Sequence, residues 1–155
     1  MLKASLALIG ALALSTQVFA ASSQYVAPAT DAAATTTTQA LNLPTETLPS
    51  GVRIEYQLRA KGPKPTATSS VKVHYRGTLV SNGTEFDSSY KRGQPATFGL
   101  NQVIPCWTEG MQRLSVGSKA ILTCPASTAY GARGAGAAVP ANADLRFEVE
   151  LLEIR

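Results

Sequence analysis

Three stretches of this chain alternate apolar and polar residues with a period of two, and this pattern constrains the fold more than any other feature of the sequence. In the first stretch, 52–58, Val, Ile, Tyr and Leu alternate with Arg, Glu and Gln. The same alternation returns at 71–79 and at 145–151. Because period-two alternation is typical of strands that bury one face, we expect a sheet with one face packed on a core.

Shorter extended segments separated by turn residues complete the predicted sheet. The Asn82-Gly83 pair favours a tight hairpin, since both residue types tolerate a positive φ. The shorter strands are expected at 84–88, 96–99 and 119–124. With a single short helix, these segments predict an α+β domain in which a curved antiparallel sheet of five or six strands wraps around that helix.

The expected helix, 107–114, begins beside an apolar segment that contains a proline, Val103-Ile104-Pro105-Cys106-Trp107. Proline suits the first turn of a helix because its φ is fixed and it lacks an N–H. Trp107 is the only tryptophan in the chain, and it is either an ordinary core residue or the floor of an apolar pocket. The other large aromatic residues on predicted strands or strand ends would then supply the walls, and the loop 131–143 the rim.

The first twenty residues have the pattern of a secretory signal peptide. Lys3 precedes an apolar run from Leu6 to Leu14, and Val18-Phe19-Ala20 fits the small-x-small pattern of a cleavage site. We expect cleavage after Ala20, export to a periplasmic or secreted location, and no membrane span afterwards. The alternative is an uncleaved membrane anchor, although the apolar run is short for a bilayer.

Residues 21–47 are rich in Ala, Thr, Ser and Pro and have almost no charge. They lack an apolar period of either 3.6 or 2, so we predict a disordered linker between the signal and a folded domain at 48–155. A helical arm for dimerisation is the alternative, but the segment has no heptad pattern. We therefore expect a monomer.

Several kinds of chemistry are poorly supported by the sequence. The net charge is +4, but the only basic run is Lys91-Arg92, which argues against binding of nucleic acid. The only histidine, His74, is expected on the solvated face of its strand, so neither a metal site nor a histidine-based triad is complete. No Gly-x-Ser-x-Gly elbow or phosphate-binding loop occurs. We expect no metal and no cofactor.

Rotation about a prolyl peptide bond needs none of these groups. The cis and trans forms of an X–Pro bond differ little in free energy, but amide resonance gives a barrier of about 18–20 kcal/mol. An apolar pocket removes water from the polarised carbonyl and thereby disfavours the planar, resonance-stabilised form. A pocket that fits the twisted bond better than the planar one therefore accelerates rotation.

Five motifs in order give the chain a strong resemblance to the FKBP-type peptidyl-prolyl cis-trans isomerases. The resemblance covers residues 48–155 and implies the same wrapped sheet. The motifs are Val73-His74-Tyr75-Arg76-Gly77-Thr78-Leu79, Asn82-Gly83-Thr84-Glu85-Phe86-Asp87-Ser88-Ser89, Val103-Ile104-Pro105-x-Trp107-x-Glu109-Gly110-Met111, Ala129-Tyr130-Gly131 and Phe147-x-Val149-Glu150-Leu151-Leu152.

The resemblance also implies a set of site residues. Asp87 and Tyr130 match the positions linked to catalysis, the first by orienting or polarising the substrate and the second by bonding a carbonyl through its hydroxyl. Asp87 on its own could instead be a turn-forming residue. The backbone N–H of Ile104 matches a second donor to a carbonyl. The substrate-binding set, which combines an aromatic lining, an aliphatic edge and a rim residue, is Tyr75, Phe86, Phe98, Val103, Ile104, Trp107, Val139 and Phe147.

The resemblance implies an isomerase that acts on proline-containing unfolded or extended polypeptides during the folding of exported proteins. Macrolide inhibitors of the family are possible ligands. The alternatives are a proline-binding chaperone module with little turnover, a surface-acting factor that binds extracellular matrix, and an unrelated β-barrel that binds small apolar ligands.

The two cysteines depart from the family pattern. Glycine is usual at the position of Cys106 and an aliphatic residue at that of Cys124, and these are the only cysteines present. Because export leads to an oxidising compartment, we hypothesise a Cys106–Cys124 disulfide. Two independent buried thiols are the alternative. The loop residues Ala135-Gly136-Ala137-Ala138 are also smaller than in many family members, which leaves substrate preference open.

Overall fold

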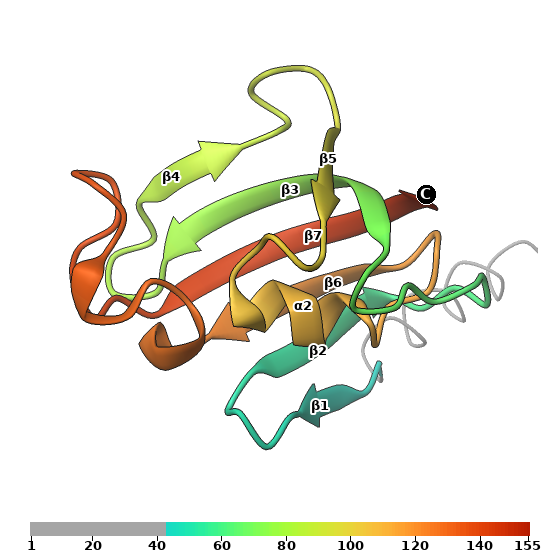
Figure 1. The fold of residues 1–155 in the computed structure, drawn as a ribbon, viewed down its shortest axis with the longest axis horizontal. Helices are drawn as coiled ribbons and strands as arrows, with labels where there is room; N and C mark the ends of the chain where they lie inside the picture. Colours follow the sequence, from blue (N-terminus) through green and yellow to red (C-terminus); the bar gives the residue numbers. More distant parts are fainter. Residues whose placement is uncertain (1–42) are drawn as a thin grey trace, which may run out of the picture. The chain divides into compact units, whose positions relative to one another are not determined.

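The computed structural model describes residues 43–155, which form one antiparallel sheet with a helix against its face (Figure 1). The predicted signal peptide and residues 21–42 of the predicted linker lie outside the described residues. The strands are β1 (Thr45–Thr47), β2 (Arg53–Leu58), β3 (Ser70–Leu79), β4 (Glu85–Ser88), β5 (Ala96–Gly99), β6 (Lys119–Cys124) and β7 (Leu145–Ile154). The helices are α2 (Pro105–Met111) and the single 3-10 turns η2 (Ala126–Thr128) and η3 (Gly131–Arg133).

The strand order is β1-β2-β6-β7-β3-β4, and β5 also pairs with β3. The two ten-residue strands β3 and β7 run side by side through the middle of the sheet (Figure 1). β4 and β5 share the other edge of β3, with β4 opposite 76–78 and β5 opposite 70–73. The segment between β4 and β5 must therefore pass the middle of β3, and this places residues 89–95 beside Tyr75.

The sheet contains seven strands rather than the five or six expected from the sequence, because β1 pairs with β2. β1 lies within the segment 21–47 assigned to the linker, so ordered structure begins before Leu48. Its sequence, Thr45-Glu46-Thr47, has no apolar alternation to signal a strand. The backbone pairing of Glu46 with Ile54 holds it on the edge of the sheet.

Helix α2 begins two residues before the predicted 107–114 segment, with Pro105 in its first turn. It ends at Met111, and Leu114 lies in the following turn but is fully buried. Gly110 lets the helix approach β6 closely, because a Cβ at this position would lie 3.0 Å from Leu122 Cδ1. No side chain caps the helix N-terminus, and neither end carries a compensating charge in its terminal turn.

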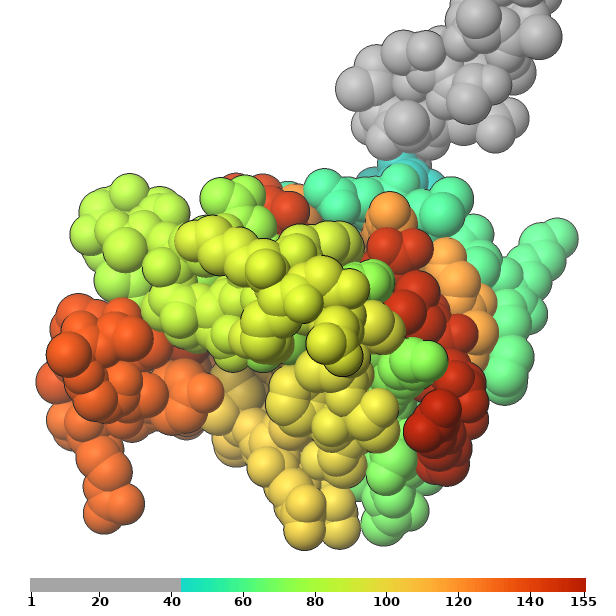
Figure 2. Space-filling view, turned by 90° about the horizontal axis from the view of Figure 1, so that it is seen from above, coloured from blue at the N-terminus to red at the C-terminus, as the bar shows by residue number. Residues whose placement is uncertain are grey.

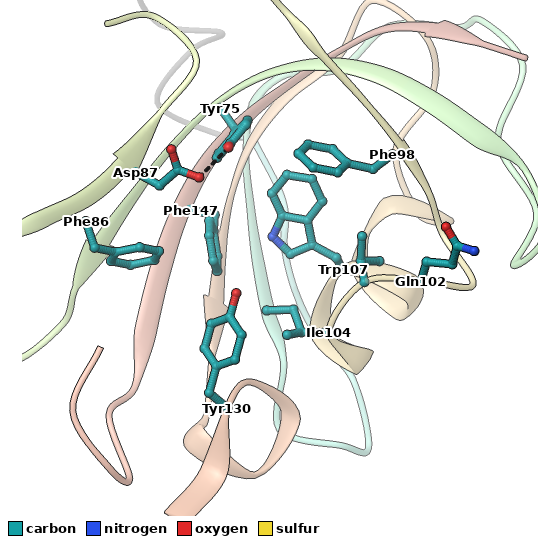
Figure 3. A pocket seen from close by; sticks show the side chains of 10 residues that line it. Tyr75, Phe86, Asp87, Phe98, Gln102, Ile104, Trp107, Tyr130 and Phe147 are labelled. Atoms are coloured by element: carbon teal, nitrogen blue, oxygen red, sulfur yellow. Dashed lines mark hydrogen bonds between the residues drawn. The ribbon is translucent and has the colours of Figure 1, made fainter. Parts of the chain in front are cut away.

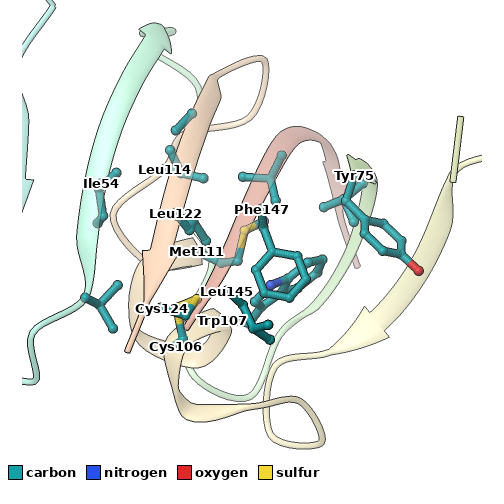
Figure 4. Packing of buried hydrophobic residues seen from close by; sticks show 14 of the residues in the cluster. Ile54, Tyr75, Cys106, Trp107, Met111, Leu114, Leu122, Cys124, Leu145 and Phe147 are labelled. Carbon is teal, nitrogen blue, oxygen red and sulfur yellow. A yellow bond between two sulfur atoms is a disulfide. The ribbon is translucent and has the colours of Figure 1, made fainter. Parts of the chain in front are cut away.

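The core lies between α2 and the concave face of the sheet (Figure 4). The inward positions of the alternating strands supply most of it, as predicted. Cys106 in the first turn of α2 and Cys124 at the end of β6 form a disulfide, with their Cα atoms 5.7 Å apart. The largest fully buried side chains include Ile54, Val71, Val73, Leu100, Met111, Leu114, Leu122, Leu145 and Leu151.

The segment between β6 and β7 folds back toward the β3–β4 hairpin. The Val80 N–H donates to the Asp144 carbonyl over 3.0 Å, and the space-filling view shows this segment (orange) standing next to the hairpin (yellow-green) (Figure 2). Within the described part of the chain, no helix has the length and apolar character needed to cross a membrane.

Candidate active site

A cavity of about 400 Å³ opens between α2, the concave face of the sheet and the segment after β6 (Figure 3). This volume is within the range typical of small-ligand sites. Most of the lining is aromatic or aliphatic, with one carboxylate and one amide. The lining residues are Tyr75, Phe86, Asp87, Phe98, Gln102, Val103, Ile104, Trp107, Tyr130 and Phe147.

Trp107 is the centre of the aromatic cluster. The rings of Tyr75, Phe98 and Phe147 each meet the indole edge-to-face, with centroid separations of 5.4 Å. Phe86 meets Phe147 in the same way at 5.6 Å. Such perpendicular contacts favour a fixed arrangement of rings, so the walls are held in place without a ligand. The two readings of Trp107 are therefore compatible: only 4% of its surface is exposed, and it lines the cavity.

The two hydrogen-bond donors that the family resemblance implies, the Tyr130 hydroxyl and the Ile104 N–H, belong to residues that line this cavity. The Tyr130 hydroxyl points into it, and the side chain is 38% exposed (Figure 3). Tyr130 lies between η2 and η3. The backbone N–H of Ile104 donates no hydrogen bond within residues 43–155, because it precedes the first turn of α2.

Asp87 lies at the mouth of the cavity in a network with Tyr75 and Arg92. The Tyr75 hydroxyl donates to Asp87 Oδ2 over 2.5 Å, and Arg92 Nη1 donates to Asp87 Oδ1 over 2.5 Å. Partial burial alone would raise the pKa of Asp87, but the hydrogen bonds from Tyr75 and Arg92 outweigh it and hold the pKa below its ordinary value. Burial and the bond to Asp87 raise the pKa of Tyr75, so the phenol stays protonated at neutral pH.

Val139 does not line the cavity in the structure. Only 2% of its surface is exposed, and it belongs to the core cluster, so its contact with a substrate at the rim stays a prediction. Paired backbone bonds between Ala135 and Val139 close the loop on itself, which accounts for the inward position of Val139. The sequence reading also missed Gln102, a lining residue, and the role of Arg92, which it noted only as part of a basic pair.

His74 is less solvated than predicted. Its ring stacks on Tyr90 with centroids 4.7 Å apart, and Nδ1 lies 3.0 Å from the Ser89 hydroxyl. The ring is on the opposite face of β3 from Tyr75, so it takes no part in the cavity. Among residues 43–155, no group of three or more His, Cys, Asp or Glu side chains is arranged to hold a metal ion.

Comparisons with known proteins agree with this geometry. The family model described as FKBP-type peptidyl-prolyl cis-trans isomerase matches residues 62–152. The chain is 57% identical over 105 residues to the FKBP-type peptidyl-prolyl cis-trans isomerase FkpA of Aeromonas hydrophila, a match that covers 68% of this chain and 38% of the relative. It is 50% identical over 107 residues to FK506-binding protein 1 of Dictyostelium discoideum, covering 68% of this chain and 99% of that one.

A solved structure supports the same assignment. The crystal structure of FkpA from Escherichia coli superposes with a TM-score of 0.69 and 37% identity, covering 79% of this chain and 57% of that one. The chain thus spans well under two thirds of the FkpA proteins it matches, but almost the full length of the Dictyostelium protein.

Proposed function

Because this chain belongs to the family of FKBP-type peptidyl-prolyl cis-trans isomerases, we propose that it accelerates cis/trans rotation about X–Pro bonds in unfolded or extended polypeptides. The observation that carries the proposal is the preformed cavity of about 400 Å³ with Trp107 as its floor. It is lined by rings that can surround a pyrrolidine, and it lies beside two donors for a carbonyl, the Ile104 N–H and the Tyr130 hydroxyl.

The proposed mechanism is differential binding of the twisted bond. The aromatic walls exclude water from the substrate carbonyl, so the charge-separated planar form of the imide loses its hydration. The Ile104 N–H and the Tyr130 hydroxyl bond carbonyl groups of the bound peptide outside the rotating imide and so hold the peptide in place as the bond rotates. Each ~1.4 kcal/mol by which these contacts favour the twisted state gives about a tenfold increase in rate. No proton is transferred, and no covalent intermediate forms.

The decisive experiment is a protease-coupled assay on a short peptide with one X–Pro bond. Faster cis/trans exchange that a macrolide ligand of the family suppresses is the expected result. If the folded protein binds the peptide without accelerating exchange, the isomerase proposal is wrong and the alternative, a proline-binding chaperone module, is favoured. Trp107 fluorescence supplies the binding measurement, because it is the only tryptophan in the chain.

We also propose that the chain is exported, cleaved after Ala20, and works as a monomer in the periplasm or outside the cell. The N-terminal pattern and the disulfide support this location, since disulfides persist in oxidising compartments. Mass spectrometry of the exported protein tests the cleavage site, and sedimentation tests the monomer. A mature protein that still begins at Met1 would contradict the export signal.

A further inference from the structure

The Cys106–Cys124 disulfide connects two parts of the chain that enclose the cavity. Cys106 lies in the first turn of α2 and directly precedes Trp107, the floor of the cavity (Figure 4). Cys124 is the last residue of β6, and the segment after it carries Tyr130, whose hydroxyl points into the cavity (Figure 3). Neither cysteine follows the pattern of the family, so the bond is a feature of this chain.

The two ends of α2 are held to β6 by different means. At the C-terminal end the packing is close, since a Cβ on Gly110 would lie 3.0 Å from Leu122 Cδ1. At the N-terminal end, next to the cavity, the cap residue Ile104 makes no side-chain hydrogen bond. Within the described residues, no backbone hydrogen bond joins 104–107 to β6. The disulfide therefore holds the cavity end of the helix to the sheet.

Loss of the bond must change the spacing between α2 and β6. Bonded sulfur atoms lie about 2.05 Å apart, whereas unbonded heavy atoms pack at about 3.5–4.0 Å. Both cysteines are fully buried, so free thiols have packed neighbours on every side and no solvent into which to turn. The first turn of α2 then moves away from the end of β6, and Trp107 moves with it.

The same bond fixes the distance between the two proposed carbonyl donors. The Ile104 N–H lies just before Cys106, and the Tyr130 hydroxyl follows β6. The connecting segment is stiff, because it forms the 3-10 turn η2 and because the Ala126 N–H donates to Asp144 Oδ1 over 2.8 Å. A shift at the disulfide is therefore carried to both donors.

We propose that Cys106 and Cys124 are positioning residues, whose bond sets the spacing of Trp107, Ile104 and Tyr130 and thereby the affinity of the cavity. This inference rests on the proposed binding of prolyl peptides there. The donors contact the peptide outside the rotating imide, both before and during rotation. Loss of their spacing therefore raises KM more than it lowers kcat.

The test compares the parent chain with the Cys106→Ala, Cys124→Ala double variant. KM and kcat come from the protease-coupled assay, and the affinity for a macrolide of the family comes from Trp107 fluorescence. Ile54→Ala is the matched control, because it also removes fully buried side-chain volume, but from β2, and it leaves the disulfide and the cavity lining intact.

A spectroscopic measurement reports on the cavity floor directly. Trp107 is the only tryptophan in the chain, and its indole N–H is buried without a hydrogen-bond partner among residues 43–155. The single indole N–H resonance in a proton–nitrogen NMR spectrum therefore follows the position of the ring. It should shift in the double variant and stay near its parent position in Ile54→Ala.

The parent chain can also be tested after reduction. A dithiol reduces the bond to two thiols and itself becomes a cyclic disulfide, a transfer of two electrons and two protons. Alkylation of the thiols in denaturant shows that reduction is complete. Only the macrolide affinity is measured in this case, because the reductant would also attack disulfides of the coupling protease.

We expect the double variant to raise KM and the macrolide Kd about three- to tenfold, the effect of roughly one lost hydrogen bond, while kcat stays within about twofold. Reduction of the parent should raise the macrolide Kd by the same factor. Ile54→Ala should leave KM and Kd within about twofold of the parent values. Unchanged KM and Kd in the double variant, or an equal rise in Ile54→Ala, would overturn the proposal.

The macrolide affinity separates this inference from the proposed function. If the parent chain binds the macrolide without accelerating exchange, the isomerase proposal fails, while Kd still reports on the disulfide. If the double variant does not fold, as judged by circular dichroism, the reduced parent decides: a raised Kd supports the inference and an unchanged Kd contradicts it. A reduced parent that unfolds would also contradict it, since the bond would then support the whole fold and not the cavity alone.

Discussion

A substitution at Tyr130 should change the rate of isomerisation with little effect on the free energy of unfolding. Its side chain is 38% exposed, and its hydroxyl points into the cavity (Figure 3). We expect Tyr130→Phe to lower kcat/KM about three- to tenfold, because one hydrogen bond to the carbonyl, worth about 1 kcal/mol, is lost. The free energy of unfolding, measured in urea, should change by less than about 0.5 kcal/mol. An unchanged rate would remove Tyr130 from the proposed carbonyl contacts.

The lowered pKa of Asp87 predicts that the protein loses free energy of unfolding in acid. Its pKa in the folded chain lies below the ordinary value of about 3.9, because hydrogen bonds from Tyr75 and Arg92 outweigh the effect of partial burial. A lowered pKa stabilises the fold above the unfolded-state pKa, and this contribution is lost as pH falls through the folded-state pKa.

The test compares the parent chain with Asp87→Asn in urea at several pH values. The parent should be the more stable at pH 6, and the gap should shrink steadily below about pH 4. A gap that stays constant from pH 6 to pH 2 would mean that the charge of Asp87 does not stabilise this network.

At the scale of elements, α2 depends on the disulfide more than on its own sequence. It has only seven residues and lacks an N-terminal cap, and so short a helix is marginal by itself. The Cys106–Cys124 bond closes a loop with a sequence separation of 18 between the first turn of α2 and the end of β6. We expect the Cys106→Ala, Cys124→Ala double variant to lose about 3 kcal/mol of unfolding free energy.

The control for this measurement is reductant. Adding it should lower the midpoint of urea unfolding of the parent chain and leave that of the double variant unchanged. If reductant has no effect on a parent chain whose thiols are shown to be free, the bond does not support α2.

Gly77 on β3 packs directly against two of the rings that line the cavity. A Cβ on Gly77 would lie 2.6 Å from Phe86 Cζ and 2.9 Å from Phe147 Cε1, so both wall rings must move to accept it. We expect Gly77→Ala to raise KM for prolyl peptides several-fold and to cost about 1–3 kcal/mol of stability. Gly83→Ala is the control, since Gly83 has φ +72° with nothing within 4 Å: it should cost stability through backbone strain while leaving KM unchanged.

Elements were predictable where side-chain pattern and turn residues agreed. The strands at 96–99 and 119–124 have the predicted bounds, because turn residues precede them, Gly93-Gln94-Pro95 before the first and Gly117-Ser118 before the second. β1 was missed because only its backbone pairing defines it.

The site was predictable only in part, for a related reason. Tyr75 and Phe147 face inward on the alternating strands, so alternation placed these two with the core, whereas the resemblance to the family supplied the rest of the set. The partners of Arg92 depend on a turn and on a long flexible side chain, which leave no periodic signal in the sequence. The burial of Val139 could not be predicted, because the sequence does not reveal that its loop closes on itself through the Ala135–Val139 bridge.

At the scale of the whole molecule, the described residues contain a complete core and a complete cavity, so residues 1–42 should be dispensable for folding and for turnover of short peptides. β1 lies just inside this boundary. It forms three pairs with β2, and Leu48, which follows it, is only 6% exposed in the core. A chain that begins at Leu43 therefore keeps the three β1–β2 pairs, whereas one that begins at Pro49 loses both the strand and the buried leucine.

These two truncations measure where the domain begins. The chain 43–155 should match the protein without its first 20 residues to within about 0.5 kcal/mol of unfolding free energy, and its kcat/KM should be unchanged. The chain 49–155 should lose about 2–4 kcal/mol, because removal of a buried leucine leaves a cavity and β2 becomes an unpaired edge. Equal stability of the two truncations would show that neither β1 nor Leu48 contributes to the fold, which would contradict this prediction.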